Sequence, residues 1–484
     1  MNAIDILREF RYELIAFTTG ASVMMLEIVG ARLIAPYLGT SVYVWTAMIG
    51  TILGALAVGY WLGGRLADKP YDHRQLLAVV LAGAAVLVLM TAFMQDMTLN
   101  SVAAADIDLR IGALLAGVVL FGPPSLLIGM VMPHVAKIRI TSLDTTGRSI
   151  GRLEAAGAVG SIAGTFACGY WLLGYVGSEN IALAIVVVLV LTSFLAHKSV
   201  FLWLRVSIAV IAVLVMVVPQ VEAAGILADV DSSYGRYRVI ESELNGRTTH
   251  SLVTDPFSIQ SQIFVDDPGE PALSYIQRFM EVFVNLDASN VLVIGGGAHT
   301  FPTALVQRSD TVDVTVVEID PKLDELASEY FAFKQSERLR VVHADGRAYL
   351  NQQHGPYDVL YVDAFSSLTP PFQLATEEAV IRMAAGVAPD GVVVVNVIGS
   401  YGGSSDNFAN AMYTTFRAGF ADVHLYQVAP EFDLQRRQNL LLVASNSNDA
   451  LERAASSFGD LEIPSYKPGL MLTDDYAPVE RLTY

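Results

Sequence analysis

The first 218 residues alternate between long apolar stretches and short polar loops. A helix that crosses a bilayer needs about 20 mostly apolar residues. By this measure the sequence predicts about seven spans, and the Pro123-Pro124 pair inside one of them predicts a kink or a break. The predicted spans are residues 14–36, 43–65, 76–94, 111–133, 154–176, 179–197 and 200–218.

The pattern changes after a junction that we place at residues 219–234. Residues 235–265 alternate polar and apolar positions, which predicts a small antiparallel β segment. From Val291 onward, short apolar runs alternate with helix-like segments, as in a doubly wound, mainly parallel, Rossmann-like α/β sheet. We therefore expect a polytopic α-helical membrane bundle at 1–218 and an α/β domain at 235–484.

Composition supports this division. The mean hydropathy is +0.47, and only 16% of the residues are charged. The net charge of −18 falls almost wholly on the second half of the chain. An acidic domain suits a small cationic substrate and argues against nucleic-acid binding. The single cysteine, Cys168, excludes a disulfide within the chain, and the spacing of the histidines predicts no metal site.

Candidate chemistry lies directly after four successive predicted strands. Gly295, Gly296 and Gly297 follow the first strand, Glu318 ends the second, and Asp345 and Asp363 follow the third and fourth. Ligands of open parallel sheets bind at these carboxyl ends. The glycines would let the backbone approach a nucleoside, and Glu318 is placed for a ribose diol. Asp345 suits either the adenine amine or a helix cap, and Asp363 could position or deprotonate an amine.

These residues resemble the spermidine synthase family of polyamine aminopropyltransferases, over about residues 235–446. That family transfers an aminopropyl group from decarboxylated S-adenosylmethionine to an amine and releases methylthioadenosine. The resemblance implies that Glu318 contacts the ribose, that Asp345 contacts the adenine, and that Asp363 is catalytic.

The resemblance extends to other parts of the chain. It implies a cofactor contact at Gln260, within Thr254–Ser261, and a substrate-side tyrosine at Tyr275. With its apolar first half and its Thr473-Asp474-Asp475 tail, the whole chain is similar to the membrane-fused bacterial branch of the family. This implies a multi-pass protein of the bacterial inner membrane, in contact with the lipid bilayer.

Two positions depart from the family pattern. Family members that bind diamines have an acid directly after the triple glycine and another acid three residues after the catalytic one. This chain has Ala298 and Ser366 at these positions, although Ser366 stays on the substrate side of the site. A cationic substrate that lacks its carboxylate partner in a desolvated site loses several kcal/mol of binding free energy. The sequence therefore does not identify the acceptor substrate.

The membrane half has candidates of its own. Glu27 and Arg32 lie in the first predicted span, where ionisable groups are costly and often functional, as a pair or along a polar path. The basic loops at 65–74 and 137–152 should face the cytoplasm. Seven spans would then place the α/β domain outside, whereas the supply of cofactor favours the cytoplasm, and both possibilities stay open.

The sequence favours a membrane-bound, metal-free transferase that acts on S-adenosylmethionine or decarboxylated S-adenosylmethionine and releases methylthioadenosine. One alternative is a lyase or cyclising enzyme that needs no amine acceptor, or a methyltransferase on the same fold. Another is a membrane transporter or sensor with a non-catalytic nucleoside-binding domain. The recurrence of Gly59–Gly64 as Gly169–Gly174 favours the transporter, and Asp363 favours an enzyme. The chain is also compatible with a homo-oligomer.

Overall fold

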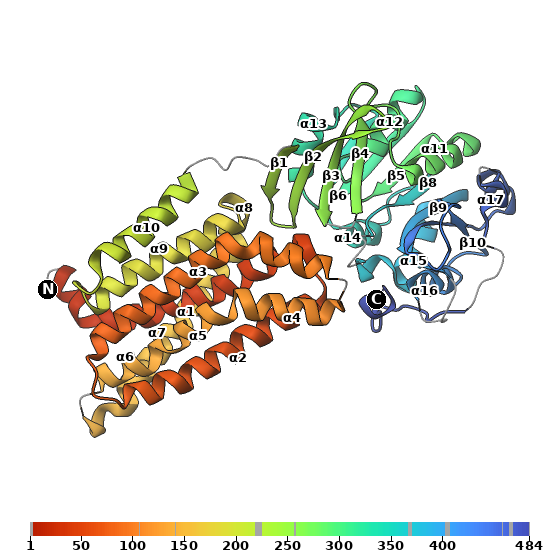
Figure 1. Cartoon of the computed structure of the whole chain (residues 1–484). Coiled ribbons are helices and arrows are strands. Elements are labelled where there is room, and N and C mark those ends of the chain that lie inside the picture. Colours follow the sequence, from red (N-terminus) through yellow and green to blue (C-terminus); the bar gives the residue numbers. More distant parts are fainter. Residues whose placement is uncertain are drawn as a thin grey trace. The chain divides into compact units, whose positions relative to one another are not determined.

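The computed structural model describes residues 3–105, 107–140, 142–217, 225–255, 258–365, 370–401, 407–456, 458–463 and 468–483. The chain forms two compact units (Figure 1). One unit comprises Met1–Glu222 and Val230–Arg236, and the other comprises Ala223–Asp229 and Tyr237–Tyr484.

Up to residue 217, the described part of the first unit is helical. Its elements are α1 (Ala3–Leu38), α2 (Val42–Ala67), α3 (His73–Ala104), α4 (Leu109–Leu120), α5 (Gly122–Gly129), α6 (Val131–Arg139), η1 (Leu143–Thr145), α7 (Thr146–Ala167), the π-helical turn η2 (Cys168–Leu172), α8 (Leu173–Tyr175), α9 (Ser178–Ala196) and α10 (Leu202–Val217).

Five helical stretches in the described chain are long and apolar enough to cross a membrane. A sixth candidate is α4 together with Gly122–Arg139, a pair bent by 51°. The bend falls where Pro123 and Pro124 begin α5, as the sequence predicts. The predicted span at 200–218 corresponds to α10, whose 16 residues rise only about 24 Å. The structure thus gives five or six long candidate spans and one shorter apolar helix.

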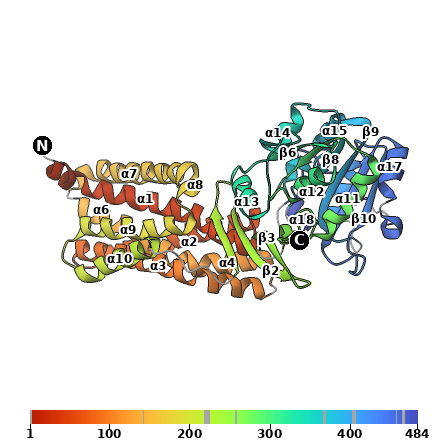
Figure 2. The same ribbon diagram turned by 90° about the horizontal axis from the view of Figure 1, so that it is seen from above.

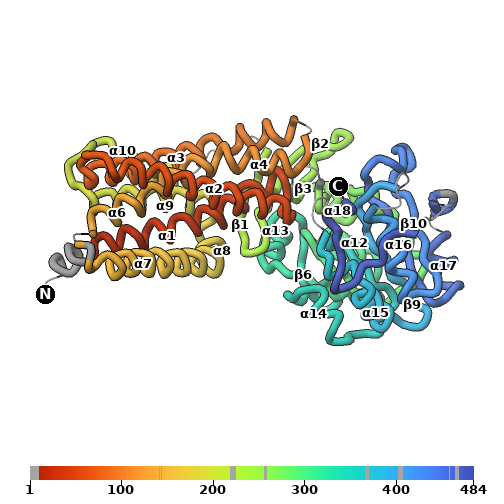
Figure 3. The backbone as a smooth tube through the Cα atoms, turned by 90° about the horizontal axis from the view of Figure 1, so that it is seen from below, coloured from red at the N-terminus to blue at the C-terminus, as the bar shows by residue number. Residues whose placement is uncertain are grey.

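Glycines allow α1 and α7 to pack closely. The two helices lie side by side (Figures 2 and 3). A Cβ added to Gly160 would lie 2.0 Å from the carbonyl oxygen of Phe17, and one added to Gly164 would lie 2.6 Å from that of Ala21. Larger residues at either glycine would therefore push α7 away from α1, since the obstacle is backbone.

The second unit contains two sheets. The smaller has the order β1-β2-β3-β4, and its β2–β3 and β3–β4 pairs are antiparallel. Its strands are β1 (Ile226–Asp231), β2 (Arg236–Leu244), β3 (Arg247–Asp255) and β4 (Ser258–Phe264). Strands β2 to β4 lie within the antiparallel segment that the sequence predicts at 235–265, whereas β1 lies in the predicted junction at 219–234.

The larger sheet has seven strands in the order β10-β11-β9-β8-β5-β6-β7. The five strands β5 to β9 are parallel to one another, and β11 pairs antiparallel with both β9 and β10. The sheet is therefore mixed. The strands are β5 (Asn290–Ile294), β6 (Asp313–Glu318), β7 (Leu339–His343), β8 (Tyr357–Val362), β9 (Val387–Gly399), β10 (Asp422–Gln427) and β11 (Gln438–Ser445). Its helical elements are α11 (Ser274–Leu286), α12 (Thr300–Arg308), α13 (Lys322–Tyr330), α14 (Gly346–Asn351), η3 (Phe372–Leu374), α15 (Glu377–Gly386), α16 (Phe408–Phe416), α17 (Asn448–Ala455), η4 (Gly459–Leu461) and α18 (Val479–Thr483).

Helices cover both faces of this sheet. Side chains of α14, α15 and α16 form one apolar core with the central strands. On the other face, Tyr361 of β8 is fully buried and stacks on Phe279 of α11 at 3.8 Å. Strand order reverses between β5 and β8, which is where doubly wound sheets bind their ligands.

Candidate functional site

The glycine turn lies at the carboxyl end of β5. The amide of Gly295 donates a hydrogen bond of 2.9 Å to the carbonyl of Val317, next to it in β6. Gly295 has a φ of +89°, and a Cβ there would lie 2.6 Å from the carbonyl oxygen of Asp363. Both the backbone conformation and the close approach of the β8 end therefore require glycine at this position.

Glu318 holds the turn from the end of β6. Its Oε2 accepts hydrogen bonds from the amides of Gly296, at 2.9 Å, and Gly297, at 3.3 Å, and its Oε1 accepts one from Asp320. The side chain is buried, with 6% of its surface exposed. A carboxylate has about four lone-pair positions, so one remains for a further donor such as a ribose hydroxyl.

Two side chains brace the turn from outside. Ser261 of β4 accepts a hydrogen bond of 3.0 Å from the amide of Ala298, whose methyl is fully buried. His299 is also fully buried, and its Nε2 lies 2.8 Å from Oδ1 of Asp324. The other carboxylate oxygen of Asp324, Oδ2, lies 3.1 Å from Nε2 of His343. His299 thus lies behind the turn, against Gly296, as part of its support.

Asp363 lies at the end of β8, beside the glycine turn. Its Oδ1 accepts a hydrogen bond of 2.8 Å from Asn396, and its Oδ2 accepts one of 3.2 Å from the hydroxyl of Tyr275. Burial raises the pKa of Asp363 to about 6, while the hydrogen bonds from Asn396 and Tyr275 oppose this increase. Burial and the nearby Asp363 charge raise the pKa of Tyr275 well above its usual value, so Tyr275 remains a donor.

Asn396 is a site residue that the sequence analysis misses. It is 2% exposed in β9, and its oxygen accepts a hydrogen bond of 2.9 Å from Asn439 of β11. Asn439 and Asn396 are diagonal neighbours, since Leu441 pairs with Asn396 in the β11–β9 register. The feature of the sequence that could have identified it is a single asparagine within the valine-rich run of residues 392–397.

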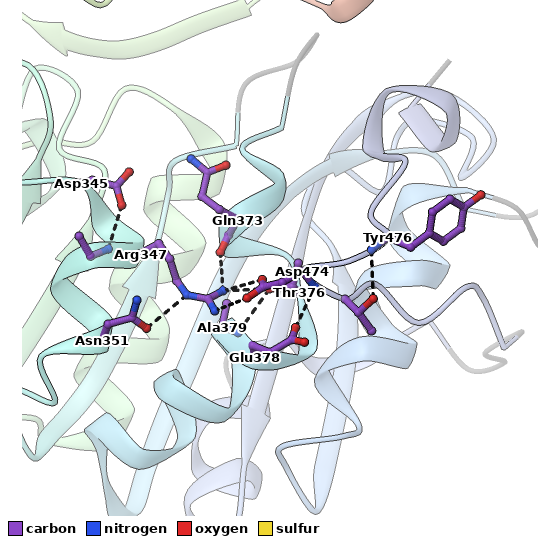
Figure 4. Close-up of polar contacts among 11 residues, drawn as sticks. Asp345, Arg347, Asn351, Gln373, Thr376, Glu378, Ala379, Asp474 and Tyr476 are labelled. Carbon is purple, nitrogen blue, oxygen red and sulfur yellow. Dashed lines mark hydrogen bonds and ion pairs between the residues drawn. The ribbon is translucent and has the colours of Figure 1, made fainter.

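The structure brings several predicted site residues together. Tyr275 of α11 contacts both Asp363 and the backbone carbonyl of Gln260, the latter at 3.2 Å. Asp345 accepts a hydrogen bond of 2.8 Å from Ala348 and so caps α14 with one oxygen (Figure 4). Ser366 lies outside the described residues.

The predicted membrane residues are not joined to each other. No ion pair links Glu27 to Arg32 in the described chain, where Arg32 instead donates to the backbone carbonyl of Ser233. Ser233 lies in the 230–236 segment that packs with the helices. Arg32 therefore has a structural contact, and a polar path through this span stays a prediction.

Comparisons with known proteins bear on the α/β unit. Residues 277–426 match the family model of the spermine/spermidine synthase domain. A "probable polyamine aminopropyl transferase" of Bifidobacterium longum is 29% identical over 252 residues, which are 47% of this chain and 56% of that protein. The chain thus spans little more than half the length of this relative.

A second relative extends into the helical half. "Polyamine aminopropyltransferase 1" of Streptomyces coelicolor is 23% identical over 459 residues, covering 87% of this chain and 81% of that protein. Among solved structures, a "probable spermidine synthase" from Corynebacterium glutamicum is 19% identical with a TM-score of 0.41, over 49% of this chain and 87% of that one.

Proposed function

We propose that this chain, whose residues 277–426 form a spermine/spermidine synthase domain, is a membrane-attached enzyme of the aminopropyltransferase type. Its substrate would be decarboxylated S-adenosylmethionine or S-adenosylmethionine, and methylthioadenosine would be released. The observation that carries the proposal is the setting of Asp363. Its carboxylate is held by Tyr275 and Asn396 at the switch point of the sheet, beside the glycine turn.

In the proposed reaction, no protein side chain forms a covalent bond with the substrates. A neutral amine attacks the aminopropyl carbon next to the sulfonium, a carbon–nitrogen bond forms, and the carbon–sulfur bond breaks. The electron pair of that bond stays on sulfur, which leaves as the neutral thioether of methylthioadenosine. The new ammonium group then loses a proton to Asp363, and from there to water. The side chains need only orient the amine, stabilise its charge and accept the proton.

The nucleoside side of the site follows from the strand ends. Glu318 would accept a hydrogen bond from a ribose hydroxyl in addition to those from the backbone amides. Asp345 would accept one from the adenine amine with the carboxylate oxygen that does not cap α14. Gln260 lies next to Tyr275 and would contact the donor, as the family resemblance implies. These assignments give the donor two anchors at the ends of β6 and β7 and a third within β4.

The acceptor side supports a second candidate on the same donor. A fully buried methyl stands at Ala298, where the diamine-binding pattern has a carboxylate. Without that charge, and with intact S-adenosylmethionine as the substrate, the substrate's own carboxylate could attack the carbon attached to sulfur. A carbon–oxygen bond would form, the carbon–sulfur bond would break, and a lactone and methylthioadenosine would result. Such a lyase or cyclising enzyme needs no cation partner for a second substrate.

Membrane attachment is proposed from the long apolar helices. At the N-terminal end of α1, Glu13 pairs with Arg139 and Arg152, which belong to the basic segment 137–152. Basic loops of this kind face the cytoplasm. At the other end of the helical unit, Glu179 pairs with Arg236 at 2.8 Å. If α10 crosses the membrane toward that end, the residues after it would lie on the outer side of the membrane. The supply of donor instead favours the cytoplasm for the α/β unit.

One experiment separates the candidate activities. The purified full chain is incubated with S-adenosylmethionine or its decarboxylated form, with and without putrescine, and products are identified by mass spectrometry. Methylthioadenosine formed only with putrescine supports the transferase, and methylthioadenosine formed without it supports the lyase. Adenosylhomocysteine would indicate a methyltransferase. Binding without turnover would overturn the enzyme proposal in favour of a sensor or transporter.

A reporter experiment addresses the side of the membrane. A reporter that is active only in the cytoplasm is inserted in the 137–152 segment or fused after Tyr484. Matching signals place the α/β unit with the cytoplasmic donor. Opposite signals would make α10 a further crossing and would contradict the use of a cytoplasmic donor.

A further inference from the structure

The C-terminal segment Leu472–Tyr476 is bonded to the start of α15. The amide of Glu377 donates to the carbonyl of Leu472 at 2.8 Å, and the amide of Asp474 donates to Oε2 of Glu378 at 2.9 Å. Tyr476 closes a tight turn with Thr473 (Figure 4). The reaction as described above assigns no role to these residues.

Arg347 joins this segment to the sheet. Its Nη2 lies 2.7 Å from Oδ2 of Asp474, and its Nη1 lies 3.1 Å from Oδ1, so the ion pair is bidentate. Nη1 also lies 3.0 Å from both the carbonyl oxygen of Gln373 and the hydroxyl of Thr376 (Figure 4). The Arg347 side chain is only 15% exposed. A planar guanidinium held in two directions at once is a rigid anchor.

The anchored residues lead back to the candidate site. Arg347 lies in the first turn of α14, two positions after Asp345. Gln373 and Thr376 lie at the end of the connection that begins at Asp363 and leads into α15. Asp474 accepts a further hydrogen bond of 2.7 Å from Thr376, the N-cap of α15. One arginine therefore ties the start of α14 and residues 373–376 to the same carboxylate.

We propose that Asp474 is a positioning residue, and that the segment Leu472–Tyr476 is a strap that acts through Arg347. It holds residues 373–376, which lead into α15, beside the start of α14, so that the site around Asp363 keeps the geometry that the reaction needs. The inference rests on the proposed function for its effect on turnover. The contact of the strap with residues 372–376 can be tested without turnover.

The kinetic test compares Asp474→Asn with Asp475→Asn in the full chain. Asp475 is the matched control, because it is exposed and no hydrogen bond or ion pair engages its side chain in the described residues. We expect Asp474→Asn to lower kcat for methylthioadenosine release about tenfold, as for a lost charge-assisted hydrogen bond. The Kd for methylthioadenosine should stay within about twofold, since the nucleoside anchors are unchanged. Asp475→Asn should change neither, and Asp474→Glu should restore most of kcat.

A merely structural role gives a different result. If Asp474→Asn only reduces the folded fraction, kcat and the number of binding sites for methylthioadenosine fall together. If kcat of Asp474→Asn equals that of the wild type, the positioning role is overturned.

Hydrogen exchange tests the strap independently of activity. The amides of Leu374 and Ala375 donate to the carbonyls of Pro371 and Phe372, so their exchange reports on this turn. We expect faster exchange at residues 372–376 in Asp474→Asn and wild-type rates in Asp475→Asn. A wild-type chain that never releases methylthioadenosine would overturn the proposed function, yet this comparison would still test the strap. Equal exchange in the two variants would overturn the strap itself.

Discussion

Asn396 donates a hydrogen bond of 2.8 Å to Oδ1 of Asp363, and this contact fixes the orientation of both side chains. Because Asn439 donates to the Asn396 oxygen, the amide nitrogen of Asn396 must face Asp363. A donor in this position stabilises the ionised carboxylate and not the protonated acid.

Replacing Asn396 with leucine should therefore make Asp363 harder to ionise. Loss of a hydrogen bond to a charged group corresponds to about one pKa unit. In Asn396→Leu, we expect the rise of methylthioadenosine release with pH to move upward by about one pH unit. The check is the pH dependence of kcat/KM, with Asn439→Ala as the control that loosens Asn396 but keeps the donor. An unmoved profile in Asn396→Leu would show that the amide does not tune Asp363.

Asp363 should also give the chain a characteristic pH dependence. Its pKa of about 6 in the folded chain lies above the ordinary value of 3.8, so activity should rise as pH increases through 6. Stability should change in the opposite direction. Ionising the raised-pKa acid costs up to about 3 kcal/mol, a cost that is absent below pH 4 and complete above pH 6. Calorimetry of Asp363→Asn should lack this loss between pH 4 and 6, and its turnover should be abolished with nucleoside binding retained.

Gly295 should be less tolerant of alanine than Gly246, another glycine with positive φ. Gly246 is the matched control, because its φ is +77° and nothing lies within 4 Å of an added Cβ. Gly246→Ala should cost only the backbone conformation, roughly 1–2 kcal/mol. Gly295→Ala adds a clash with the carbonyl of Asp363 and should cost more and abolish methylthioadenosine binding. Thermal unfolding and titration calorimetry measure the two effects, and equal costs for both variants would rule out the close approach.

Asp345 can be separated into its two roles by two substitutions. Asparagine caps helices as well as aspartate does, so Asp345→Asn should leave stability nearly unchanged. Its amide nitrogen cannot accept a hydrogen bond from adenine, so methylthioadenosine should bind about tenfold more weakly. Asp345→Ala should lose the cap as well, at about 1 kcal/mol. If Asp345→Asn binds as tightly as the wild type, Asp345 only caps α14.

The strand-end residues could be predicted because each depends on local sequence. An apolar run followed directly by glycine or an acid fixes the residue at the carboxyl end of its own strand, and parallel strands bring those ends together. Glu318 and Asp363 are found in this way. Asp345 shows the limit of this reasoning, because a residue between a strand and a helix suits both a ligand contact and a cap.

Other features depend on strand register and chain return, which sequence patterns do not contain. Asn396 reaches Asp363 across 33 positions, and Asp474 reaches Arg347 across 127. The sequence predicts seven spans and the described residues give five or six, because the described part of α10 has 16 residues, fewer than the about 20 that a crossing needs. Glu27 and Arg32 are five positions apart, which places them on different sides of a helix.

The sealed methyl of Ala298 has a consequence for protein engineering. Its side chain is fully buried and its amide is engaged by Ser261, so the position belongs to the wall behind the site. An aspartate introduced there would lose its hydration before it could meet a substrate. A single substitution at Ala298 would therefore not make this protein selective for diamines. Such selectivity would require a joint redesign of Ala298, the hydroxyl of Ser261 and the glycine turn.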